Sequence, residues 1–113
     1  MKLEQHLYMG TLLDFYGGML TQNQQKITRS YVDFNASLSE IAEQNGTTRQ
    51  AVSDVLRRSI KKMQDLENAL QLVAKYHSIL NKIPAIASKI TTDQILQQKI
   101  NFEFEQLLKT LED

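Results

Sequence analysis

Apolar residues recur every three or four positions along most of the chain, which is the spacing of one face of an α-helix. This pattern predicts a first helix over about residues 4–16, which a glycine pair at 17–18 ends. Thr21 with Gln24 has the sequence of a capping box and opens a second helix that reaches about Phe34. The apolar side of the second helix is expected to consist of Ile27, Tyr31, Val32 and Phe34.

The stretch from Leu38 to Val55 has the pattern of two short helices joined at a glycine, the second of them polar and basic. Ser37 with Glu40 gives another capping box at the start of the first helix. Ala42 provides the small residue that a helix-turn-helix needs where its second helix crosses the first. Gly46 supplies the left-handed backbone of the turn.

Thr48 is placed to cap the second helix of this motif, and Val52 and Val55 are expected to point inward. With Leu38 and Ile41 they would form a miniature core. Counted from Leu38, the residues Ala42, Gly46 and Val52 fall at positions 5, 9 and 15, as a helix-turn-helix requires. The stretch is therefore predicted to be a helix-turn-helix, and its core is expected to consist of Leu38, Ile41, Ala42, Gly46, Val52 and Val55.

Between Arg49 and Pro84 no glycine or proline occurs, so the second helix is predicted to continue, straight or bent, to about Leu80. A heptad seam would hold His77 as a buried or register-setting polar residue; its positions are Val52, Leu56, Ser59, Met63, Leu66, Leu70, Val73, His77 and Leu80. A second apolar stripe lies beside it, at Ala69, Leu72, Tyr76, Ile79 and Ile83. The C-terminal helix, a second protomer, or both would cover these two sides.

Pro84 is expected to stop or kink this helix and to begin a short apolar connection over residues 84–90. Thr91 with Gln94 reads as a third capping box, opening a last helix that reaches about Leu111 and lies antiparallel to the long one. Its apolar side would carry Leu96, Ile100, Phe104, Leu107 and Leu111. The sequence thus predicts an all-α single domain over residues 1–113, with a helix-turn-helix core at 1–62 and a helical stalk and C-terminal helix at 63–113.

Composition narrows the possible functions. The 113 residues are 42% hydrophobic and 23% charged, as in an ordinary globular protein, and they include no cysteine, which excludes disulfides and thiolate metal sites. His6 and His77 lie far apart without a metal-binding spacing, so we expect neither a catalytic centre nor a metal or cofactor. The N-terminal residues resemble neither a signal peptide nor a membrane span, which predicts a cytoplasmic protein.

Charge gives opposing indications for nucleic-acid binding. Lys and Arg total 13 and Asp and Glu total 13, so the chain lacks the basic excess of a strong nucleic-acid binder. Residues 49–62 nevertheless carry a local excess of positive charge. Asp54 is the one acid in this segment, and the basic residues are Arg49, Arg57, Arg58, Lys61 and Lys62. The C-terminal segment 93–113 is acidic by comparison.

If Val52 and Leu56 face inward, the opposite side of the helix is free to contact DNA. The candidate base readers there are Arg49, Gln50, Ser53 and Arg57. The candidate phosphate contacts are Lys26, Arg29, Arg58, Lys61 and Lys62. Alternatively, this face is simply solvated, with Asp54 paired along the helix, and the chain is a non-catalytic protein or RNA adaptor that binds a partner through its stalk.

The seam also predicts a homodimer, since a long helix that is apolar on two sides commonly joins small helix-turn-helix proteins. A two-fold dimer would place two recognition helices about 34 Å apart on one face of DNA. The candidate contacts between protomers are Met63, Leu66, Leu70 and Val73. In the alternative, the last helix covers the seam within a monomer.

Three stretches resemble the small YlxM-like helix-turn-helix proteins of bacteria, whose core is similar to sigma-factor region 4. They are LDFYGGMLTQNQQ at 13–25, LSEIAEQNGTTRQAVSDVLRRS at 38–59 and the leucine-rich helix that follows, roughly the first two thirds of the chain. Asn45 and Thr47 depart from the apolar residues common in such turns. Because that family is associated by gene neighbourhood with the signal recognition particle GTPase Ffh, the resemblance implies a regulatory or accessory part in that pathway, with signal recognition particle components as partners.

Overall fold

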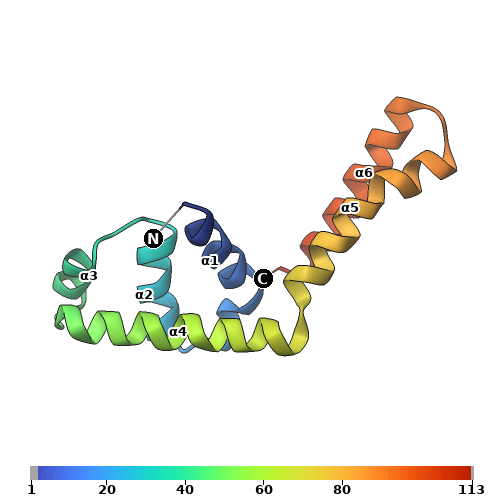
Figure 1. Ribbon diagram of the computed structural model, residues 1–113. Coiled ribbons are helices and arrows are strands. Elements are labelled where there is room, and N and C mark those ends of the chain that lie inside the picture. Colours follow the sequence, from blue (N-terminus) through green and yellow to red (C-terminus); the bar gives the residue numbers. More distant parts are fainter. Residues whose placement is uncertain (1–2, 113) are drawn as a thin grey trace. The chain divides into compact units, whose positions relative to one another are not determined.

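A computed structural model describes residues 3–112 as six α-helices and one short 3-10 helix, which confirms the all-α prediction. The chain divides into two compact units, residues 1–70 and 71–113. The first unit contains α1 (Leu3–Tyr16), the 3-10 helix η1 (Gly17–Met19), α2 (Gln22–Val32), α3 (Leu38–Asn45) and α4 (Arg49–Leu70). In this unit α1, α2 and α3 all pack against one side of α4 (Figure 1). The prediction of a single domain divided at residue 62 stays a prediction.

Two predicted capping boxes determine where helices of the first unit begin. The Gln24 backbone N–H donates to Thr21 Oγ1 at 3.1 Å, and the Thr21 N–H donates to Gln24 Oε1 at 3.0 Å. Ser37 and Glu40 make the equivalent pair of bonds, at 3.1 and 3.4 Å. Each box satisfies two backbone donors that a helix start leaves unpaired. The sequence signals for α2 and α3 are therefore confirmed.

The end of α2 differs from the prediction. The helix ends at Val32, and Phe34 is 79% exposed instead of lying on the apolar side. Asn35 takes a left-handed conformation with φ 53°, and the Ala36 N–H donates to the Ser30 carbonyl at 3.0 Å. Because the helix ends two residues before Phe34, the Phe34 side chain does not lie on the buried face of α2.

The long helix also ends earlier than predicted. α4 stops at Leu70, and Gln71, with φ 55°, breaks the chain in a left-handed conformation before α5 (Leu72–Ile90). The predicted seam is buried as far as Met63, but beyond it Glu67 is buried, whereas Leu70 is 46% exposed. Leu70 follows Val52 by 18 residues, which is five turns of a straight helix, so it keeps the direction of the seam and is exposed because the end of α4 is left uncovered, whereas Glu67, about 60° around the helix, is buried. Its carboxylate accepts a hydrogen bond from the Tyr16 hydroxyl at 2.5 Å.

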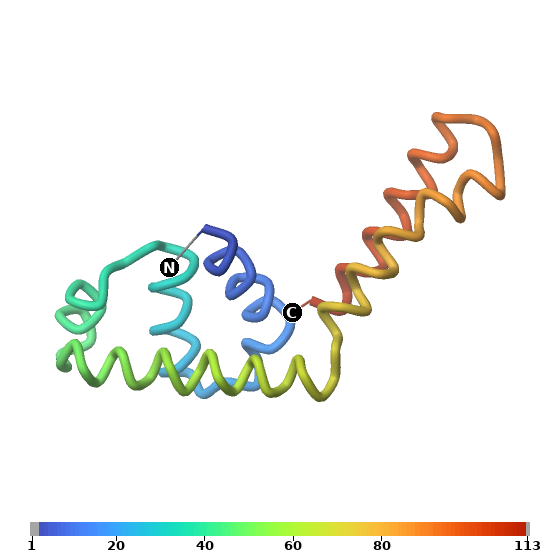
Figure 2. The backbone as a smooth tube through the Cα atoms, viewed as in Figure 1, coloured from blue at the N-terminus to red at the C-terminus, as the bar shows by residue number. Residues whose placement is uncertain are grey.

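In the second unit, α5 and α6 (Gln94–Lys109) form an antiparallel hairpin, in which the chain doubles back over residues 91–93 (Figure 2). Pro84 lies inside α5 and does not stop it. The predicted capping box at Thr91 and Gln94 is wrong, because Asp93 caps α6. Its carboxylate accepts from the backbone N–H groups of Ile95 at 2.9 Å and Leu96 at 3.2 Å.

The inward positions of α5 combine residues of both predicted stripes. Its buried residues are Val73, Ile83 and Ala87, with Tyr76 and Leu80 half-buried between them. His77, predicted to be buried in the seam, is exposed. The helix restarts after Gln71 with a new rotation, so the register of α4 does not carry over into α5. Within residues 3–112, no helix is both long enough and apolar enough to cross a membrane.

Candidate nucleic-acid interface

The turn between α3 and α4 has the backbone of a helix-turn-helix. Gly46 adopts φ 62° and ψ 37°, the left-handed region that glycine enters with little cost. The Thr47 N–H donates back to the Ala42 carbonyl at 2.9 Å, which closes the end of α3. Thr48 Oγ1 accepts from the Ala51 N–H at 3.1 Å and so caps α4.

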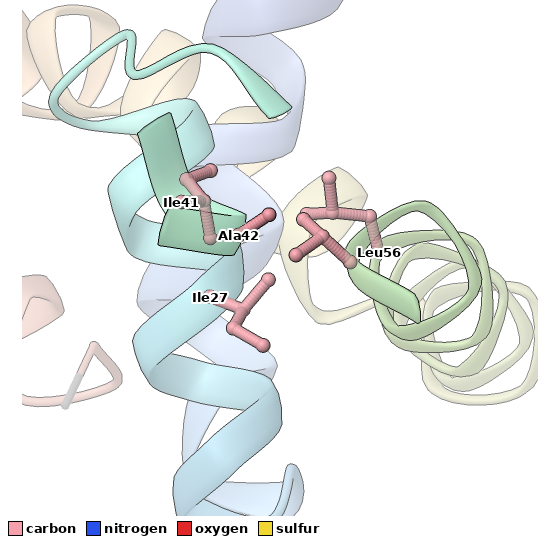
Figure 3. Packing of buried hydrophobic residues seen from close by; sticks show 5 residues of the cluster. Ile27, Ile41, Ala42 and Leu56 are labelled. Carbon is pink, nitrogen blue, oxygen red and sulfur yellow. The ribbon is translucent and has the colours of Figure 1, made fainter. Parts of the chain in front are cut away.

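Three helices contribute to the core under this turn. Ile27 of α2 lies against Ile41 and Ala42 of α3 and against Val52 and Leu56 of α4, all with at most 6% of their surface exposed (Figure 3). Leu38 and Val55 are partly buried at the edge of this cluster, beside Tyr31 and Ala36. The six residues proposed as the motif core are Leu38, Ile41, Ala42, Gly46, Val52 and Val55, and the structure brings them together around the turn.

Burial of Val52, Leu56 and Ser59 fixes the rotation of α4. At about 100° per residue, Gln50, Asp54 and Arg57 point away from the core. Arg49, Gln50 and Arg57 are exposed, whereas Ser53 is half-buried on the flank of the helix. Three of the four candidate base readers thus lie on open surface, and the fourth is less accessible.

A single carboxylate connects two of these candidates. Asp54 Oδ1 accepts a hydrogen bond from Gln50 Nε2 at 3.3 Å and from Arg57 Nη2 at 3.2 Å. The Arg57 side chain is 72% exposed, so the ion pair is solvated and contributes at most about 1 kcal/mol. The pair therefore orients Gln50 and Arg57 relative to each other while leaving both accessible.

The candidate phosphate contacts fall into two groups. Arg29 pairs with Asp33 at 3.1 Å and Lys61 with Asp65 at 3.3 Å, whereas Lys26 and Arg58 form no ion pair among residues 3–112. Both of these unpaired cations are exposed. Lys26 and Arg58 are therefore the cations most available to a phosphate.

Lys62 has a role that sequence reasoning missed. Its Nζ donates to the Met19 carbonyl at 2.6 Å, which ties α4 to the 3-10 helix η1. Gln25 Nε2 donates to the Gly17 carbonyl in the same short helix. No spacing signal reveals a bond between residues 43 positions apart, because it depends on how α1 and α4 pack. Lys62 thus stabilises the fold and is less available to DNA than its charge indicates.

The predicted dimer contacts are distributed differently from the expectation. Met63 is completely buried and Val73 is 4% exposed, so neither offers surface to a second protomer. Leu66 is half-buried and Leu70 is exposed. Among the described residues, no group of three or more His, Cys, Asp or Glu side chains could hold a metal ion.

The packed turn, the capped second helix and its outward polar face define an all-α helix-turn-helix protein. Comparison with known sequences is consistent with this class. A family model described as "Putative helix-turn-helix protein, YlxM / p13 like" matches residues 3–107. The chain belongs to this family, UPF0122.

Curated relatives come from several bacteria. A UPF0122 protein of Streptococcus gordonii is 35% identical over 100 residues, covering 88% of this chain and 91% of that protein. One from Streptococcus agalactiae is 35% identical over 101 residues, covering 89% and 92%. One from Clostridium acetobutylicum is 45% identical over 74 residues, covering 66% of this chain and 64% of that protein.

Proposed function

We propose that this chain is a DNA-binding regulator that places the N-terminal part of α4 in the major groove. The observation that carries the proposal is the exposed surface of that segment: Gln50 and Arg57 project from the side of α4 opposite the packed helix-turn-helix core, and Arg49 is exposed at its first turn. Second helices of this motif read base edges through residues near their N-terminus. The outward position of these side chains is the arrangement that such a reader needs.

Within this proposal, the base readers are Arg49, Gln50, Ser53 and Arg57. Arginine binds guanine through two parallel hydrogen bonds, and glutamine can do the same for adenine. Asp54 keeps Gln50 and Arg57 in one hydrogen-bonded group, which lowers the freedom that these long side chains lose on binding. Asp54 could instead accept from a cytosine amino group, so it would favour particular bases and weaken nonspecific binding.

Phosphate contacts would come first from Lys26 and Arg58, which form no ion pair within the described chain. Lys61 and Arg29 would contribute after exchanging Asp65 and Asp33 for phosphates, and Lys62 would contribute least because of its bond to Met19. Each phosphate neutralised releases counterions, so affinity should fall steeply with salt concentration.

The proposal is tested by fluorescence anisotropy of the full chain against mixed-sequence duplexes at two salt concentrations. Arg58→Ala should weaken binding by about threefold to tenfold and reduce the slope of log affinity against log salt by about 0.9. Lys109→Ala, which removes the same charge from an exposed site in α6, is the control and should leave both unchanged. Absence of binding at low salt, or equal losses in both variants, would overturn the proposal.

A second candidate function is an adaptor that binds protein or RNA. The balanced charge of the chain and the two aspartates on the outer face of α4, Asp54 and Asp65, favour it because they repel DNA phosphates. Isolation of the tagged chain from a bacterial extract, analysed for both nucleic acid and protein, separates the two functions. Action in the cytoplasm and a part in the signal recognition particle pathway stay predictions, and recovery of Ffh in that experiment would support the second.

A further inference from the structure

The α5–α6 hairpin has a small core and a large apolar surface. Of its described residues, three apolar side chains are buried: Val73, Ile83 and Ala87. Its large apolar residues that remain exposed are Leu111, which follows α6, and Ile79, Ile86, Ile90, Ile95, Leu96, Phe102, Phe104 and Leu107. Two helices cannot enclose this many apolar side chains between them, so the hairpin taken by itself leaves most of its hydrophobic surface in water.

Most of these side chains lie on one face. In α5, Ile79 and Ile86 are rotated by about 80–100° from the inward direction that Val73, Ile83 and Ala87 define. In α6, Leu96 and Leu107 are rotated by a similar angle from the half-buried residues that face α5. Since the helices are antiparallel, equal rotations of the same sense bring both rows to the same side of the hairpin.

A groove on this side of the hairpin supports the assignment, because residues of both helices line it. Its apolar lining is Ile90 from α5 and Leu96, Ile100, Phe104 and Leu107 from α6. We define the hairpin face as Ile79, Ile86, Ile90, Leu96, Ile100, Phe104, Leu107 and Leu111. Ile95 and Phe102 lie outside it, on the side of α6 that points away from α5.

The size of the hairpin face fits a protein interface. Seven of its residues, all except half-buried Ile100, expose between 38% and 65% of their surface. At about 150–200 Å² for a large apolar residue, they present roughly 500–700 Å² of apolar area. The largest apolar patch of a typical monomer is about 300–600 Å², and each partner in a standard interface contributes about 800 Å². The face, with its polar rim, is therefore large enough for a stable dimer.

We propose that the hairpin face binds the same face of a second copy of this chain, so that the two hairpins form a four-helix bundle. The hairpin needs a cover for its apolar face wherever the chain is folded, and a second copy is always available at the same place and time. Antiparallel hairpins that meet face to face produce the usual bundle, in which each helix packs against two neighbours.

The rims of the face carry one pair of opposite charges that a two-fold dimer would bring together. Lys75 and Lys82 border the face on the outer side of α5, and Glu103 borders it on the outer side of α6, where Lys99 also lies. Lys82 precedes Thr91 by nine residues and Glu103 follows Asp93 by ten, so they lie at nearly the same level of the hairpin. A two-fold axis parallel to the helices would lay α5 on the partner's α6 and bring Lys82 close to the partner's Glu103, twice per dimer.

Sedimentation of the full chain over a range of micromolar concentrations tests the interface. The unaltered chain should sediment as a dimer, and Leu107→Lys, at a residue 65% exposed and outside the hairpin core, should weaken association by at least about 100-fold. The matched control is Phe102→Lys, at a residue 59% exposed but outside the hairpin face, and it should remain dimeric. Circular dichroism should show unchanged helix content in both variants.

A charge exchange tests the proposed orientation of the two copies. Lys82→Glu should weaken the dimer by about threefold to thirtyfold, and adding Glu103→Lys should restore it. A monomeric unaltered chain, an unaffected Leu107→Lys variant, or equal losses in Leu107→Lys and Phe102→Lys would overturn the assignment of the face. A double charge variant weaker than Lys82→Glu alone would overturn the parallel two-fold arrangement.

Discussion

Replacing Gly46 by alanine should destabilise the helix-turn-helix through its backbone alone. Gly46 has φ +62°, and a Cβ added there would meet no heavy atom within 4 Å, so no steric contact adds to the cost. A residue with a Cβ pays roughly 1–2 kcal/mol in this left-handed region. The reduced freedom of the unfolded chain offsets about 0.4–1 kcal/mol of this cost. The expected net loss in free energy of unfolding is about 1 kcal/mol.

The matched control is the same chemical change at Gly10, within α1. There an added Cβ would lie 3.7 Å from Val32 Cγ1, an ordinary van der Waals contact, and the backbone is already helical. Alanine has a higher helix propensity than glycine by about 0.8–1 kcal/mol. Gly10→Ala should therefore stabilise the first unit by about 0.5–1 kcal/mol, with the opposite sign to Gly46→Ala.

Urea unfolding followed by circular dichroism, with hydrogen exchange at the Ile41 and Val52 amides, measures both changes in the first unit. For a unit of this size, 1 kcal/mol corresponds to about 4–8 °C in melting temperature. Gly46→Asn should lose less than Gly46→Ala, because asparagine enters the left-handed region more readily. This explanation of the turn would be refuted if the Gly46→Ala variant were as stable as the unaltered chain. It would also be refuted if Gly10→Ala destabilised the first unit by as much as Gly46→Ala does.

Three further predictions follow from hydrogen bonds and charges. Tyr16→Phe removes the hydroxyl bonded to buried Glu67 and should lower the free energy of unfolding by about 1–3 kcal/mol in urea titrations. Asp54→Asn keeps the side-chain shape but removes an acid from the outer face of α4, and should raise duplex affinity by about threefold to tenfold at low salt, less at high salt. Burial, together with nearby Glu112 and Glu105, raises the pKa of Tyr76 above 10.0 in the folded chain. The unfolded chain therefore releases this proton first, so hairpin stability should fall as pH rises above about 10, and Tyr76→Phe should remove that part of the decline in thermal melts.

Local sequence signals were sufficient for the starts of α2, α3 and α4 in the first unit, though not for the ends of α2 and α4. The capping boxes at Thr21 and Ser37 act within three residues, and so does the bond between Thr48 and Ala51. Gly46 likewise determines its turn through its own backbone freedom. These interactions involve neighbours in the sequence, which is why the helix-turn-helix and the direction of its basic face could be predicted.

Tertiary structure decided two kinds of feature. Some depend on contacts between residues that are distant in the sequence, and for others the local sequence allowed more than one conformation. The break at Gln71 carries no glycine or proline signal, and glutamine enters the left-handed region less readily than glycine, so the sequence does not indicate it. The Tyr16 hydroxyl donates to buried Glu67, 51 residues away in the sequence, and Lys62 donates to a carbonyl of η1, 43 residues away. Helical periodicity tells which residues share a face, but only the packed helices show which face is covered.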